Sequence, residues 1–222
     1  MALGLAATAE RSASAQTRSS SGPATPPEQG PITDSAATAH TLVVHLIPLG
    51  TISPETVEQT ARGLREHAPV TVAIEARQPL PASAESSEKK RYRAERILGW
   101  LPRLAIGPGK LLAVTDVDIV TRKGQAPNWG ILGLGAIDGR ACLLSTFRMK
   151  RAWEKGGAPE ALVRQRLWKT SVHELGHTLG LEHCPNRGCI MEDGHGTVRT
   201  SDRESALCPS CARRFAAAIA AQ

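Results

Sequence analysis

The part of the chain with the clearest hydrophobic pattern, residues 41–120, alternates between two kinds of segment. Three short runs rich in β-branched and other apolar residues predict buried strands over residues 41–47, 70–76 and 110–120. Between them, apolar residues recur at helical spacing over residues 54–67, behind Ser53 as N-cap and Pro54, and over residues 87–101. Such alternation is typical of an α/β domain, so we expect a mostly parallel sheet with covering helices.

The pattern changes in the second half of the chain. Residues 129–136 (WGILGLGA) and 141–146 (ACLLST) flank the turn pair Asp138-Gly139, which predicts a hairpin-like pair of strands. The first of these strands is rich in glycine, so its backbone is open to close approach. A long run of helical periodicity from Pro159 to Gly180 then predicts a single long helix.

Residues 1–38 lack any such pattern and are rich in Ala, Ser, Thr and Pro. We therefore expect a disordered tail ahead of one domain over residues 39–222. The mildly apolar start (MALGLAATA) would suit an export signal, but no basic residue precedes it and Glu10 and Arg11 interrupt it. We expect a cytoplasmic protein, with export as the alternative, and no membrane partner, because no run approaches the roughly 18 apolar residues of a membrane helix.

The net charge of +6 would suit a nucleic-acid partner only if the basic residues clustered. They are scattered, apart from residues 89–93 (KKRYR), which we interpret as a solvated face of the second predicted helix. We therefore expect no nucleic-acid partner.

The most informative segment is residues 173–184, HELGHTLGLEHC. His173 and His177 are four residues apart, so on a helix both imidazoles lie on one face and can reach one ion. Glu174, beside them, can then reach a water bound to that ion. The alternative is an ordinary helix whose histidines cap it or form salt bridges.

His183 completes the pattern only if the helix ends before it. On a continuing helix, six residues beyond His177, it would be rotated by roughly 240° and carried about 9 Å along the axis. Gly180 stands where the chain must leave the helix, and glycine accepts the left-handed conformation that ends helices. The spacing thus predicts three histidines with an open fourth position, the arrangement of catalytic zinc.

Four of the five cysteines form a second candidate site. Cys184, Cys189, Cys208 and Cys211 have the spacing C-x4-C and C-x2-C, which predicts a structural zinc site. The alternative is a pair of disulfides in an exported protein. Because Cys184 follows His183 directly, we expect that loss of the cysteine-bound metal would loosen the histidine site. The remaining cysteine, Cys142, is interpreted as a small buried apolar residue.

Together with Met191, the run HELGHTLGLEHC-x4-CIM followed by C-x2-C closely resembles the archaemetzincins, a branch of the metzincin zinc peptidases. The close resemblance covers residues 173–211. It implies a metzincin-like fold: an N-terminal subdomain, residues 39–180, with a twisted mixed sheet and an active-site helix, and a small C-terminal subdomain, residues 181–222, stapled by zinc. The active-site cleft would run between them.

The resemblance also implies roles for individual residues. It gives the catalytic zinc to His173, His177 and His183, and the role of general base to Glu174. Met191 would support the metal from below without binding it. The zinc ligands of the second, structural site would be Cys184, Cys189, Cys208 and Cys211.

Two features depart from related patterns. Sixteen residues separate Met191 from Cys208, one fewer than in the archaemetzincin pattern. Glu192 and Asp193 follow Met191, where some other metzincins carry a tyrosine, so stabilisation of the oxyanion would rest mainly on zinc. His195 is interpreted as an exposed loop residue, with a donor role as the alternative.

These inferences predict a monomeric zinc metallopeptidase with two zinc ions per chain and a peptide or protein substrate. The substrate would lie extended along the glycine-rich strand, adding its backbone to the sheet. The residues expected to contact it are Trp129, Gly130, Ile131, Leu132 and Gly133. The alternatives are a zinc-stabilised binding module with little or no proteolytic activity and a metallohydrolase that acts on a non-peptide bond.

Overall fold

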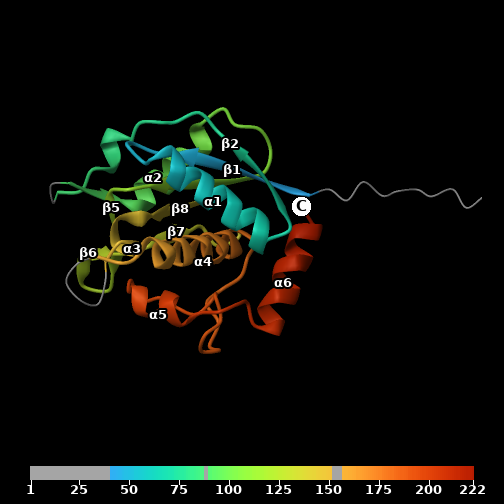
Figure 1. The fold of residues 1–222 in the computed structure, drawn as a ribbon. Helices are drawn as coiled ribbons and strands as arrows, with labels where there is room; N and C mark the ends of the chain where they lie inside the picture. Colours follow the sequence, from blue (N-terminus) through green and yellow to red (C-terminus); the bar gives the residue numbers. More distant parts are fainter. Residues whose placement is uncertain (1–40, 88–89, 152–156) are drawn as a thin grey trace, which may run out of the picture. The chain divides into compact units, whose positions relative to one another are not determined.

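The computed structural model describes residues 41–87, 90–151 and 157–222, and the predicted tail lies outside them. A five-stranded sheet forms its centre (Figure 1). In spatial order the strands are β2 (Val70–Ile74), β1 (Leu42–Pro48), β4 (Lys110–Thr115), β8 (Ala141–Ser145) and β7 (Gly133–Gly135). The first four are parallel, and β7 pairs antiparallel with β8 at the edge. This mixed, mostly parallel sheet confirms the predicted fold class.

Helices cover both faces of this sheet because its strands are apolar on both sides. Helices α1 (Pro54–His67) and α4 (Glu160–Thr178) share one core with Leu112, whereas α2 (Ala94–Trp100) shares the other with Leu111. As predicted, Ser53 caps α1, and its Oγ accepts a hydrogen bond from the Thr56 amide at 3.2 Å.

A second, three-stranded sheet consists of β3 (Arg91–Arg93), β5 (Asp118–Lys123) and β6 (Ala126–Gly130), in the order β3-β5-β6. Two predictions were wrong here. The strand expected over residues 110–120 divides at a bend, so that β4 and β5 belong to different sheets.

The helix expected over residues 87–101 begins only at Ala94, and the segment before it is β3. Its period of two places Tyr92 against the apolar core, while Arg91 donates to Asp118 at 2.9 Å. Residues 91–93 are therefore a paired strand and not a solvated helix face.

The predicted hairpin is correct for only part of its first strand. Of residues 129–136, only β7 pairs with β8, and Trp129 and Gly130 belong to β6 of the second sheet. Between these two strands the chain turns inward, and Ile131 and Leu132 are buried. The burial of these two side chains interrupts the strand that the sequence pattern predicted.

Beyond Gly180, a loop leads to the short helix α5 (Val198–Arg203) and then to α6 (Pro209–Ala220). Leu181, Met191 and Phe215 from this region pack in the same core as α1 and α4. The predicted division into subdomains at Gly180 stays a prediction. A short helix, α3 (Thr146–Met149), and two 3-10 turns, Ala82–Ala84 and Leu101–Arg103, complete the described elements.

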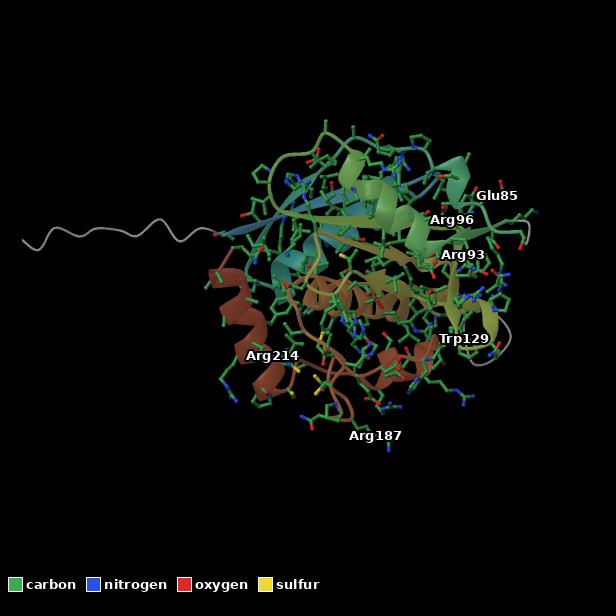
Figure 2. All side chains as sticks on the ribbon, turned by 180° about the vertical axis from the view of Figure 1, so that it is seen from behind. Glu85, Arg93, Arg96, Trp129, Arg187 and Arg214 are labelled. Atoms are coloured by element: carbon green, nitrogen blue, oxygen red, sulfur yellow. The ribbon has the colours of Figure 1, made fainter. Side chains whose placement is uncertain are left out.

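Basic side chains occur on distant elements of the domain. Arg93 and Arg96 lie beside Glu85, whereas Arg187 and Arg214 project from the loop after α4 and from α6 (Figure 2). Within the described residues, no helix is both long enough and apolar enough to span a bilayer.

Candidate metal centres

Helix α4 presents His173 and His177 to each other with their Nε2 atoms 3.0 Å apart. The Nδ1 atom of His173 lies 2.6 Å from the Ile190 carbonyl oxygen, and that of His177 lies 2.8 Å from the Leu181 carbonyl oxygen. A carbonyl oxygen only accepts, so each Nδ1 carries the hydrogen and each Nε2 has a free lone pair. Tetrahedral zinc holds two nitrogen ligands about 3.3 Å apart, so the pair fits such an ion.

The two rings are also held in the neutral form that metal binding requires. Burial, together with the neighbouring His177 ring, lowers the pKa of His173 to about 3. Burial likewise lowers the pKa of His177. Both imidazoles are therefore uncharged near pH 7, with lone pairs available to a cation.

The helix ends where the sequence predicted. Gly180 has φ +79°, its amide donates to the His177 carbonyl at 3.0 Å, and the Leu181 amide donates to the Gly176 carbonyl at 3.0 Å. These two bonds form a Schellman motif. The turn brings His183 back, with its ring centroid 4.8 Å from that of His177, and the ligand atoms of the three histidines lie within 4.8 Å of one another.

Glu174 lies on the same helix beneath strand β7 and is only 5% exposed. Burial raises the pKa of its carboxyl group to about 8, although a hydrogen bond from the Gly135 backbone opposes this shift. A β-carbon on Gly133 would lie 2.5 Å from Glu174 Oε1, and one on Gly135 would lie 2.6 Å from the Glu174 carbonyl oxygen. The open backbone inferred from the sequence is thus used by α4, which packs directly on β7.

Met191 lies fully buried under the histidine pair. A β-carbon on Gly176 would lie 2.7 Å from its sulfur atom, so the thioether packs against the bare backbone of α4. The Met191 carbonyl also accepts from the Cys184 amide at 2.7 Å, which joins the loop beneath the helix to the segment that follows His183.

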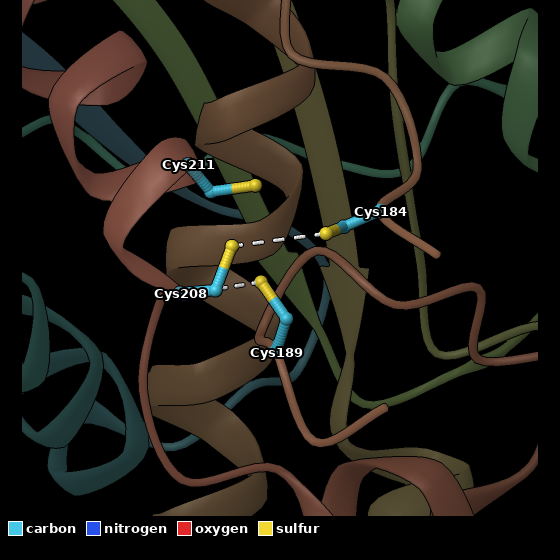
Figure 3. A group of neighbouring side chains, drawn as sticks. All are labelled: Cys184, Cys189, Cys208 and Cys211. Carbon is cyan, nitrogen blue, oxygen red and sulfur yellow. Dashed lines mark hydrogen bonds between the residues drawn. The ribbon is translucent and has the colours of Figure 1, made fainter. Parts of the chain in front are cut away.

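The four cysteines of the predicted second site come together, with their sulfur atoms turned toward one another (Figure 3). All four Sγ atoms lie within 4.8 Å, and those of Cys184 and Cys208 are 3.8 Å apart. A disulfide would require about 2.05 Å, and within the described residues every cysteine is a free thiol. Four thiolates around zinc at about 2.3 Å have their sulfur atoms about 3.8 Å apart, so the set fits zinc.

Hydrogen bonds also prepare the sulfur atoms for metal binding. The Cys208 amide donates to Cys189 Sγ at 3.3 Å, and the Asn186 amide donates to Cys184 Sγ at 3.4 Å. Bonds from the Cys211 backbone and the Asn186 side chain lower the pKa of Cys208 to about 6. These donors favour the thiolate of Cys208, the form that binds metal, whereas burial raises the pKa of Cys189 and Cys211.

A cavity of about 420 Å³ opens beside the three histidines and Glu174. Of the five residues expected to contact substrate, Trp129, Ile131, Leu132 and Gly133 line it. Gly130 is not among its lining residues, because the Arg148 guanidinium occupies the space where a Gly130 side chain would lie.

The cavity also has lining residues that the sequence interpretation missed. They include Leu134, Gly135 and Ile137 on or after β7, and Thr170, Ser201 and Glu204 on or directly after helices α4 and α5. Thr170 precedes Glu174 by one helical turn, so helical spacing could have identified it. No motif marks Ser201 and Glu204, which only the fold brings to the cavity.

Comparisons with known proteins agree with this geometry. Residues 52–217 match the model of peptidase family M54. An archaemetzincin of Haloarcula marismortui is 34% identical over 174 residues, which cover 77% of this chain and 97% of that protein.

Two solved structures of archaemetzincins are similar over most of the chain. That of Methanopyrus kandleri has a TM-score of 0.67 and 26% identity, covering 80% of this chain and 95% of its own. That of Archaeoglobus fulgidus, complexed with malonate, has a TM-score of 0.65 and 28% identity, covering 78% and 99%. The chain therefore belongs to peptidase family M54, the archaemetzincins, and is a zinc metallopeptidase.

Proposed function

We propose that this chain hydrolyses peptide bonds at a zinc ion held by His173, His177 and His183, with Glu174 as general base. The observation that carries the proposal is the orientation of the histidine pair. Both Nδ1 atoms are bound to backbone carbonyls, and both Nε2 atoms face one position with a separation of 3.0 Å. Such orientation by carbonyl groups is typical of histidines that bind metal.

When bound, zinc would supply Lewis acidity, which lowers the pKa of water toward about 7 and polarises the scissile carbonyl group. Beside the zinc cation the raised pKa of Glu174 would fall, because a nearby positive charge favours the carboxylate. Glu174 then takes the proton of the attacking water while the water oxygen bonds to the carbonyl carbon. It then gives that proton to the departing amine as the carbon–nitrogen bond breaks. The backbone of Gly135 bonds to the carboxylate and keeps it aimed at the cavity.

The substrate would lie along β7, the edge strand of the five-stranded sheet. Its free edge can take an extended peptide as an added strand, which would bring the scissile bond over α4. Of the predicted contact strand, only Gly133 belongs to this edge. Trp129 and Ile137 are 38% and 59% exposed and line the cavity, so they would offer apolar surface to the peptide.

The four cysteines would hold a second zinc ion with a structural role, giving two ions per chain. The convergence of all four sulfur atoms to within 4.8 Å of one another supports this interpretation, because it fits four thiolates around one zinc ion. The histidine site would then serve catalysis, and the cysteine site would hold the segments of chain that surround the histidine site.

A Glu174→Gln variant tests the proposal. It keeps the shape of the side chain and removes the base, so we expect turnover of a broad peptide library to fall by roughly 100-fold or more. Zinc per chain, measured by mass spectrometry, stays at the wild-type value. The exposed carboxylate of Glu66 on α1 provides the matched control, and Glu66→Gln keeps full activity.

Full activity of Glu174→Gln would disprove the assigned mechanism. Two bound zinc ions with no cleavage of any peptide by wild-type protein would favour the alternative, a zinc-stabilised binding module.

A further inference from the structure

The cavity beside the histidines has a second, polar end that the proposed chemistry does not use. It is lined by Thr170 from α4, Ser201 from α5 and Glu204, the residue that follows α5. Because Thr170 precedes Glu174 by one helical turn, this end lies next to the position of the reacting bond. We refer to Thr170, Ser201 and Glu204 as the acidic end.

Ser201 is 4% exposed, and its Oγ is the only fully buried side-chain nitrogen or oxygen in the described ranges that lacks a hydrogen-bond partner. Its carbonyl oxygen is engaged, since Lys169 Nζ donates to it at 3.0 Å. A buried hydroxyl group normally has a hydrogen-bond partner, because losing its hydrogen bonds to water without gaining new ones is unfavourable. An unpaired hydroxyl on a cavity wall is therefore available to a ligand.

Glu204 is 7% exposed, and its carboxylate has neither a hydrogen bond nor an ion pair with any other residue in the part of the chain that the structure describes. Burial raises its pKa to about 7, although the nearby Lys169 opposes this shift. The Lys169 ammonium group is held by the Ser201 carbonyl and does not form an ion pair with Glu204.

Two other acidic residues near Glu204, Asp202 and Glu192, are already paired. Asp202 forms a two-bond contact with the buried Arg166, at 2.6 and 2.7 Å. Glu192 accepts from Arg203 and from the Gly188 amide. Of Asp202, Glu192 and Glu204, only Glu204 forms no ion pair with a described residue, and it lines the cavity.

We propose that the acidic end binds a basic side chain, that of lysine or arginine, on the substrate residue next to the scissile bond. The Glu204 carboxylate accepts from the cationic head, and Ser201 Oγ accepts a second hydrogen bond from it. Leu132, which also lines the cavity, packs against the apolar stem. This specificity rests on the proposed peptidase function, because that function defines the scissile bond.

Binding of zinc-directed ligands tests this inference without requiring turnover. Two short peptide hydroxamates differ only in one side chain, which is lysine in one and norleucine, the same chain without the ammonium group, in the other. Titration calorimetry on the zinc-loaded full chain measures both affinities. We expect wild type to prefer the lysine ligand by roughly tenfold or more, the usual effect of a hydrogen bond to a charged group.

Three variants then locate the preference. Glu204→Gln is expected to abolish it while leaving the affinity for the norleucine ligand unchanged, because the amide keeps the shape and loses the charge. Ser201→Ala is expected to reduce it by a smaller factor. Glu66→Gln, the exposed control, retains the full preference.

Equal binding of the two ligands to wild type, or a lysine preference that survives in Glu204→Gln, would overturn the inference. These results would leave the peptidase proposal intact, since both ligands would still bind through the metal. Failure of both ligands to bind zinc-loaded protein would contradict the proposed zinc site itself, and with it the inference.

Discussion

The two candidate metal sites are assembled in different ways. His173 and His177 lie on one turn of a long helix, and backbone carbonyls orient both rings. The cysteines come from two points in the loop after α4 and from the start of α6, and they contact one another mainly through sulfur. The helix is part of the main core, so packing forms most of the histidine site, whereas we propose that a bound metal keeps the cysteine site closed.

The two sites are connected through short shared segments of the chain. His183 precedes Cys184 directly, and Ile190, whose carbonyl holds His173, follows Cys189 directly. A metal held by the cysteines therefore fixes two contacts of the histidine site. We infer that the two sites are coupled through this shared segment, and the coupling free energy between the two bound ions is the same in both directions.

Removal of the cysteine-bound metal is expected to have the largest effect on the stability of the folded protein. The double variant Cys208→Ala/Cys211→Ala is expected to lose at least about 5 kcal/mol of unfolding free energy, since structural zinc contributes directly to folding. Denaturant unfolding of the zinc-loaded protein measures this loss. Cys142→Ala, which removes a buried cysteine outside the cluster, is the matched control and is expected to lose far less. Equal losses in the two variants would contradict a structural zinc.

A single methyl group on β7 tests whether the histidine site depends on packing. Gly135→Ala would place a carbon 2.6 Å from the Glu174 carbonyl oxygen and 2.8 Å from His177 Cβ, atoms that cannot move without shifting α4. We expect a loss of about 3 kcal/mol in unfolding free energy, measured by denaturant titration. Gly99→Ala, where nothing lies within 4 Å of the added carbon, is the control and is expected to be neutral or stabilising. A neutral Gly135→Ala would contradict the close contact between β7 and α4.

A smaller, pH-dependent effect is expected from Glu204, on the segment that connects the two sites. Its folded-state pKa of about 7 lies above the ordinary value of 4.5. The stability that it contributes is therefore complete below pH 4.5 and is lost as the pH rises through 7. The charged groups that act on it are Lys169, Glu192, Arg203 and Asp202.

Glu204→Gln removes this dependence. The unfolding free energy of the variant minus that of wild type is expected to rise by about 2 kcal/mol from pH 5 to pH 8. Unfolding free energies at the two pH values measure the gain, with Glu66→Gln as control. A fall in this difference from pH 5 to pH 8 would mean that the folded protein stabilises Glu204 as an anion.

Features that depend on local spacing could be predicted from the sequence, whereas contacts between distant segments could not. Helix α4, its end at Gly180 and the return of His183 follow from local rules of spacing and glycine conformation, and the structure agrees with them. The strand β3 was missed because its pairing with β5 depends on a distant segment.

Likewise, the edge beside Glu174 is β7, which the sequence could not separate from β6 because both lie in one apolar, glycine-rich run. Ser201 and Glu204 carry no spacing signal relative to the histidines. They reach the cavity only because Arg166 and Lys169 of α4 anchor α5 through Asp202 and the Ser201 carbonyl.

The coupling between the two sites is tested most directly by zinc per chain during titration with a competing chelator. Wild type, Cys208→Ala/Cys211→Ala and His173→Ala/His177→Ala are compared by mass spectrometry. We predict two zinc ions for wild type and one for each variant. The ion left in the cysteine variant should be removed by roughly tenfold less chelator than the histidine-bound ion of wild type, and the ion left in the histidine variant should lose resistance by a similar factor, because coupling between two binding sites is reciprocal. Wild-type resistance of the remaining ion in both variants would show two independent sites and contradict the account.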